Sequence, residues 1–177
     1  MGFAAMTETK GADMTADRNE TLKSVFAHLE RDARPGTLVV IGGDAAPVFA
    51  LAAEAGLKDR RLAHFREGVG EAEGVETTPS LEPDIIRNTR TGNIACLVMN
   101  DVAGDIAVGA AKGLYRRLAP GGALIVLGDD MASLHDWFAA GGGGDRAPLF
   151  LSPVEGITIG LRPPLAPGPL EARYDYT

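Results

Sequence analysis

The sequence predicts an α/β fold in which a doubly wound, mostly parallel sheet ends in an antiparallel hairpin. Short apolar runs rich in β-branched residues alternate with stretches of helical period through most of the chain. This alternation is typical of parallel strands joined by crossover helices that cover both faces of a sheet. Near the C-terminus, two strand-like runs at 147–151 and 156–161 are separated only by a Pro-containing link, which indicates the hairpin.

The chain has a length typical of one domain. It contains 177 residues, of which 45% are hydrophobic, so we expect an ordinary buried core. A segment rich in Thr, Ala and Gly at 1–16 is expected to be a flexible leader, and the α/β domain occupies 17–162. Four prolines mark the tail at 163–177, which we expect to extend over the surface.

The spacing of apolar residues and the residues typical of helix ends predict the first helices and strands. Asp17 or Asn19 can cap a helix that runs to about Arg31, and the run Thr37–Ile41 is expected to be a central buried strand. Proline is favoured in a first helical turn and glycine just past a helix end, which places the next helix. The elements then expected are a helix from about Pro47 to Gly56, strands at 61–65 and 74–78, and a helical turn at 84–89.

The second half of the chain continues the alternation. A purely apolar run at 94–99 predicts another buried strand, and apolar residues at helical spacing follow it. The expected elements are, in order, a helix at 105–118, a turn at Pro120-Gly121-Gly122, a strand at 123–127, and a helix to about Ala140 that is capped by Asp129 or Asp130.

Charge, cysteine content and hydropathy argue against several functions. The formal net charge is −7 and no Lys/Arg run exceeds a pair, which disfavours nucleic acid and membrane surfaces as partners. No apolar run is long enough to span a membrane and no signal peptide is indicated, so we expect a cytoplasmic protein. Cys96 lies in an apolar run, and His28, His64 and His135 lack metal-ligand spacing, so no metal is expected.

The run LYRRLAPGGALIVLGD, Leu114–Asp129, resembles a segment of class I S-adenosylmethionine (SAM)-dependent methyltransferases. In that family a helix ends in Leu-x-Pro-Gly-Gly and leads into a hydrophobic strand. The order of elements over about residues 20–162 also resembles the family. The resemblance implies a Rossmann-like sheet of seven strands with the last strand antiparallel. It also implies that SAM lies across the carboxyl ends of the first strands, where doubly wound sheets bind ligands.

The loop in LVVIGGDAAPVFALAAEAG departs from that family's pattern. Gly42 matches the first glycine, but Val40 stands where the family has an acid, and Asp44 and Ala46 replace the later glycines. A carboxylate at Asp44 would repel the carboxylate of SAM by about 1 kcal/mol or more at close range in water. Asp44 can instead cap the following helix, contact the ammonium group of SAM, or do neither, and these interpretations stay open. The missing glycines and Pro47 also disfavour a dinucleotide.

The resemblance implies roles for six residues near the carboxyl ends of the strands. Glu67 is the nearest candidate for the acid that binds the ribose hydroxyls, although a surface glutamate is the alternative. Asp101 could act as a base or orient the acceptor, although a polar strand end is the alternative. The Asn/Asp-Pro-Pro-aromatic motif of some methyltransferases is absent. The implied catalytic residue is Asp101, and the implied SAM-binding residues are Gly42, Gly43, Asp44, Glu67 and Asn100.

Two classes of function remain open. The first is a SAM-dependent methyltransferase that transfers the methyl group to a small molecule or a protein side chain. The second is a non-catalytic binding or assembly module of the same fold, whose altered loop has lost SAM. A small-ligand sensor that uses the same cleft is a third. The partners expected are a small molecule or a protein, and the aromatic, proline-rich tail suggests a homo-oligomer.

Overall fold

The computed structural model describes residues 2–31, 36–57, 62–65, 75–78, 80–82, 85–86, 93–144 and 147–163. Glu67 and residues 164–177 of the expected tail lie outside these ranges. The elements are α1 (Gly2–Arg31), β1 (Thr37–Ile41), α2 (Ala46–Glu54), β2 (Leu62–Phe65), β3 (Val75–Thr78), β4 (Ile94–Asn100), α4 (Gly104–Leu114), the 3-10 turn η2 (Tyr115–Arg117), β5 (Leu118–Leu127), α5 (Ala132–Ala139), β6 (Leu149–Val154) and β7 (Ile157–Leu161).

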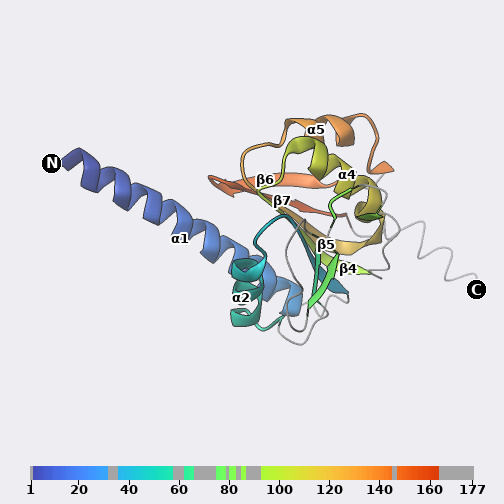
Figure 1. The fold of residues 1–177 in the computed structure, drawn as a ribbon, viewed down its shortest axis with the longest axis horizontal. Coiled ribbons are helices and arrows are strands. Elements are labelled where there is room, and N and C mark those ends of the chain that lie inside the picture. The colour runs from blue at the N-terminus through green and yellow to red at the C-terminus, as the bar shows by residue number, and fades with distance from the viewer. Residues whose placement is uncertain are drawn as a thin grey trace, which may run out of the picture.

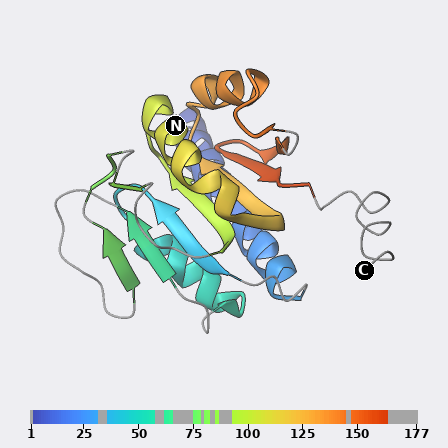
Figure 2. The same cartoon turned by 90° about the vertical axis from the view of Figure 1, so that its right-hand side faces the viewer.

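The seven strands form one sheet in the order β3-β2-β1-β4-β5-β7-β6 (Figure 2). The first five strands in this order are parallel, and β7 is antiparallel to both β5 and β6. The predicted fold class, a doubly wound sheet with a terminal antiparallel hairpin, is therefore confirmed. The chain builds outward from β1 on one side and from β4 on the other, so the carboxyl ends of β1 and β4 flank the switch point where such sheets bind ligands.

Two apolar layers cover the faces of the sheet (Figure 1). One layer packs α1 and α2 against the strands and contains Phe26 and Val40. The other packs α4 and α5 against the opposite face and contains Leu114 and Phe138. Val40 is fully buried, so an acid in its place would need a partner for its charge, because an unpaired charge is costly in an apolar layer. Within the described ranges, no helix is long and apolar enough to cross a membrane.

The start of α1 differs from the expectation. The helix begins at Gly2, so residues 2–16, expected as a flexible leader, continue α1, and Figure 1 shows this half projecting from the rest of the chain. Asp17 and Asn19 lie inside the helix and do not cap it. The backbone carbonyl of Asp17 instead accepts a hydrogen bond from Thr21 at 2.8 Å, four residues on. No proline interrupts residues 2–16, and Ala, Met, Glu and Lys favour a helix there.

The Pro-Gly-Gly segment also differs from the expectation, because residues 120–122 lie within β5. The expected helix at 105–118 ends at Leu114, and β5 begins four residues later. Ile94 of β4 pairs with Leu118, whereas Cys96 pairs with Ala123. The extra residues of β5 between these pairs form a bulge, which a Pro-Gly-Gly segment can adopt without a loop. The strand that follows the segment is still the parallel neighbour of β4, as predicted.

Asp129 or Asp130 was expected to cap α5, but neither residue does so. The N-cap residue of α5 is Met131, and it makes no capping side-chain hydrogen bond. Asp130 Oδ2 instead accepts a hydrogen bond of 2.7 Å from the backbone N–H of Gly104, the first residue of α4. A carboxylate at a helix N-terminus is favourable, so Asp130 supplies α4 with a cap from a distant part of the chain. This bond ties the loop after β5 to the loop after β4.

Candidate functional site

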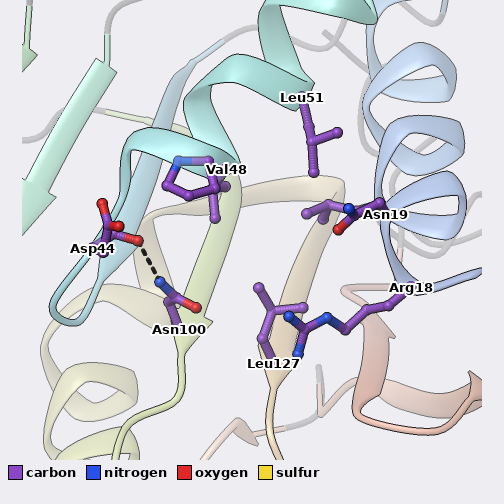
Figure 3. Close-up of a pocket in the computed structure, with 9 residues that line it drawn as sticks. Arg18, Asn19, Asp44, Val48, Leu51, Asn100 and Leu127 are labelled. Carbon is purple, nitrogen blue, oxygen red and sulfur yellow. Dashed lines mark hydrogen bonds between the residues drawn. The ribbon is translucent and has the colours of Figure 1, made fainter. Parts of the chain in front are cut away.

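A cavity of about 210 Å³ opens at the carboxyl ends of β4 and β5, between α1 and α2 (Figure 3). It lies beside the loop that follows β1, at the switch point of the sheet. Its polar lining residues are Arg18, Asn19, Asp44 and Asn100. Its apolar lining residues are Leu22, Pro47, Val48, Leu51 and Leu127.

Gly42 is required by the packing of the strands. Its φ is +124°, and a Cβ at this position would lie 2.4 Å from the backbone oxygen of Asn100. Its N–H donates to the carbonyl of Phe65 at 3.1 Å, which ties the loop to β2 as well. The neighbouring Gly43 is exposed, and a Cβ there would meet no atom within 4 Å. Gly43 is therefore the glycine of this loop that a ligand can approach.

His64 holds the loop after β1 through a hydrogen bond from β2, a role that the sequence did not indicate. The side chain is 3% exposed in β2, and its Nε2 donates a short hydrogen bond to the carbonyl of Gly42. Because a carbonyl oxygen can only accept, this bond places a proton on Nε2. The ring also meets Phe49 of α2 edge-on, with 6.4 Å between ring centroids. His64 therefore holds both the loop and the helix that follows it.

Asp44 directs its carboxylate at the start of α2. Its Oδ1 accepts a hydrogen bond of 3.2 Å from the backbone N–H of Ala46. The N-cap position belongs to Ala45, so Asp44 acts one residue earlier than a standard cap. Pro47, the next residue, has no N–H. The first two residues of α2 therefore offer no amide hydrogen to a ligand.

Asn100 connects the end of β4 to the glycine loop. Its Nδ2 donates a hydrogen bond of 2.7 Å to the backbone carbonyl of Asp44, 56 residues away in the sequence. Figure 3 shows its side-chain oxygen on the side turned away from Asp44. The structure thus brings Gly42, Asp44 and Asn100 together, as their positions at strand ends had suggested.

Asp101 lies next to this group but points elsewhere. It does not line the cavity, and its Oδ1 lies so close to Gly128 that a Cβ there would approach it to 2.8 Å. Its N–H donates to the carbonyl of Leu127 at 2.8 Å. Asp101 has a φ of 53°, which few residues other than glycine adopt. Such conformations are concentrated at functional sites, where the surrounding structure maintains them.

Arg18 is the site residue that the sequence analysis missed. It lies one helical turn before Leu22, so the apolar stripe of α1 carries it toward the sheet. The spacing of four residues between Arg18 and Leu22 is the one sequence signal that could have indicated Arg18. That signal can be interpreted only when the position of α1 against the sheet is known. Among the residues that the structure describes, no hydrogen-bond or ion-pair partner of its guanidinium is found. No three His, Cys, Asp or Glu side chains in the described part of the chain gather to hold a metal ion.

Several solved structures with a similar fold are O-methyltransferases. The O-methyltransferase NovP has a TM-score of 0.67 and 16% identity, over 82% of this chain and 79% of NovP. CalS11, a TDP-rhamnose 3′-O-methyltransferase, has a TM-score of 0.61 and 12% identity, over 83% of this chain and 79% of CalS11. MycE, solved with Mg and S-adenosylhomocysteine (SAH), has a TM-score of 0.59 and 9% identity, over 76% of this chain and 47% of MycE.

The chain has the class I SAM-dependent methyltransferase fold. No protein-family model matches the sequence, and a search of curated proteins found no relative. Identities of 9 to 16% show the fold alone.

The cavity suits part of SAM. Its polar residues carry both signs of charge, as the amino-acid end of SAM does, and its apolar walls suit a carbon chain. Its volume of about 210 Å³ is below the roughly 300 to 1,000 Å³ of pockets that enclose a whole small ligand. The cavity therefore fits the amino-acid end, and an adenosyl group would continue along the edge of the sheet toward β2. Residues 66–74, which follow β2, lie outside the described ranges.

Proposed function

We propose that the chain binds SAM across the carboxyl ends of β1 and β4 and methylates a hydroxyl group of a small molecule. The observation that carries the proposal is a cavity of mixed polarity at the switch point of a class I methyltransferase sheet. The O-methyltransferases with the same fold, and the SAH bound to MycE, support the cofactor and the type of acceptor.

In this proposal the residues divide the work of binding and proton transfer. SAM supplies a methyl group activated by its sulfonium. Gly43 lets the ligand lie close to the loop, and Asn100 keeps that loop against β4. Holding both reactants in line, away from water, supplies much of the rate in such a transfer. Asp101, exposed at the end of β4, would accept the proton of the hydroxyl from the side of Gly128.

Calorimetry with SAM and SAH tests the proposal. We expect micromolar binding of both compounds to the wild-type protein. Asp44→Gly frees the Ala46 amide and removes a negative charge, and under this proposal the wild-type protein binds both compounds without that change. If SAM and SAH bind neither protein, the proposal is wrong.

The non-catalytic module remains the second candidate because of one observation. The Asp44 carboxylate already occupies the Ala46 amide, at the place where the carboxylate of SAM was expected. Binding that appears only in Asp44→Gly would favour this candidate, since it would show that the wild-type loop excludes SAM.

We also propose that the partners are small molecules or proteins and do not include nucleic acid or membranes. The net charge of −7 supports this proposal. Exposed leucines on the terminal hairpin favour the expected homo-oligomer, because contiguous apolar surface is unusual on a monomer. These are Leu149, Leu151 and Leu161. Light scattering on the full chain measures the molar mass in solution, which distinguishes a monomer from a homo-oligomer.

A further inference from the structure

The N-terminus of α2 is poorly equipped to hold an anion in this chain. The N–H of Ala46 donates to Asp44, and Pro47 has no N–H. The N–H of Phe49 donates to the carbonyl of Ala45 at 3.0 Å. Free amides and the helix dipole normally favour an anion at such a position. Here most of the donors are used, and a carboxylate is already present.

The opposite side of the cavity carries a positive charge. Arg18 is the one cation among the nine described residues that line the cavity, and Asn19 lies beside it on α1. Figure 3 shows the Arg18 side chain reaching from α1 toward Leu127, on the far side of the cavity from Asp44. The two ends of the cavity therefore differ in sign.

Another cation of α1 shows a different arrangement. Lys23 forms ion pairs with Glu20 at 3.5 Å and with Glu54 of α2 at 3.3 Å. These two glutamates raise the pKa of Lys23, so its charge is matched within the chain. Arg18 has no acid at ion-pair distance among the described residues. A guanidinium beside a cavity, with its planar donors uncommitted, is well suited to bind a carboxylate through two parallel hydrogen bonds.

We propose that Arg18 binds the carboxylate of the amino-acid end of SAM, while the ammonium group faces Asp44 and Asn100. This assignment rests on the proposed function and specifies which residues bind the two charged groups of the ligand. It removes the conflict between Asp44 and the ligand's carboxylate, because the two negative groups lie at opposite ends of the cavity. Val48 and Leu127 then line the carbon chain between the two charges.

The experiment compares two ligands that differ in the amino-acid end. SAH carries the carboxylate and the ammonium group, whereas 5′-methylthioadenosine keeps the adenosine and the sulfur but lacks both. In Arg18→Gln we expect the affinity for SAH to fall about 10- to 100-fold, as for loss of a charged hydrogen bond. The affinity for 5′-methylthioadenosine should not change. Arg18→Lys should recover part of the SAH affinity, since it restores the charge without the planar donors.

Lys23→Gln is the matched control, because it removes a cation from the same helix at a residue that does not line the cavity. It should leave the affinity for both ligands unchanged, and thermal melting confirms that each variant is folded. Unchanged SAH affinity in Arg18→Gln overturns the inference and leaves the proposed function standing. An equal loss of affinity for both ligands overturns it too, because Arg18 would then maintain the structure of the site and not bind the carboxylate. If the wild type binds neither ligand, the proposed function fails first.

Discussion

Gly42→Ala tests whether the packing of the strands requires a glycine at the start of the loop after β1, even when no ligand is bound. The residue has a φ of +124°, and an added Cβ would lie 2.4 Å from the backbone oxygen of Asn100. A residue other than glycine in such a conformation costs about 1 to 3 kcal/mol. Forcing an extra carbon into packed backbone costs about 1 to 3 kcal/mol more. We therefore expect the free energy of unfolding to fall by about 2 to 6 kcal/mol.

Urea unfolding followed by circular dichroism measures this loss, and Gly43→Ala is the control in the adjacent position. A Cβ at Gly43 meets no atom within 4 Å, so its stability should change by less than about 1 kcal/mol. Under the proposed function, however, Gly43→Ala should weaken SAH binding, because the ligand lies close to that residue. If Gly42→Ala unfolds at the same urea concentration as the wild type, the reasoning about this turn is refuted.

Three further changes test other parts of the structure. Asp130→Ala removes the cap on Gly104 and should lower the free energy of unfolding by about 0.5 to 2 kcal/mol in thermal melts, whereas Asp129→Ala should not; equal effects would show that the cap is unimportant. Asn100→Ala removes the bond to the loop carbonyl and should cost about 1 kcal/mol and weaken SAH binding, and unchanged SAH affinity would contradict its place in the site. Burial raises the pKa of Tyr115 to about 12 from a usual 10.0. Its contribution to stability is therefore complete below pH 10 and lost as the pH rises toward 12. Tyrosinate absorbance, compared with Tyr115→Phe, measures this pKa, and titration near 10 would refute the assignment.

Much of the fold could be predicted because the central strands are buried on both faces. Thr37–Ile41 is an uninterrupted β-branched and apolar run, and the structure gives β1 these same bounds. The helix break at Gly56 was also predicted from its glycine, which has a φ of +97°. Both predictions rest on local sequence signals, and the contacts that these residues make with neighbouring elements favour the same structure. The mostly parallel sheet with its antiparallel end followed from the alternation of elements and from the resemblance.

The errors arose where a distant contact decides the local structure. Asp130 looks like a cap for the helix that follows it, but its partner is Gly104, 26 residues earlier. The Pro-Gly-Gly segment looks like a turn, but β5 pairs with β4 before and after the segment, and hydrogen bonds with Arg162 keep the segment in the strand. No pattern in the sequence alone distinguishes these outcomes.

The site was predictable in part for the same reason. Gly42 and Asp44 follow β1 and Asn100 ends β4, so the parallel pairing of these two strands brings the three residues to one edge. Arg18 and His64 belong to a helix and a strand interior, and their roles appear only when α1 and β2 are placed against the loop.

The central claim is that a SAM-like ligand lies between the glycine loop and the end of β4. A titration of the ¹⁵N-labelled protein with SAH, followed by amide NMR shifts, tests it most directly. We predict saturable shifts at Gly43, Asp44 and Asn100, with none at Leu149 and Leu151, the exposed leucines of β6. Shifts confined to the hairpin, or absent at the loop when SAH is in excess, would contradict the claim.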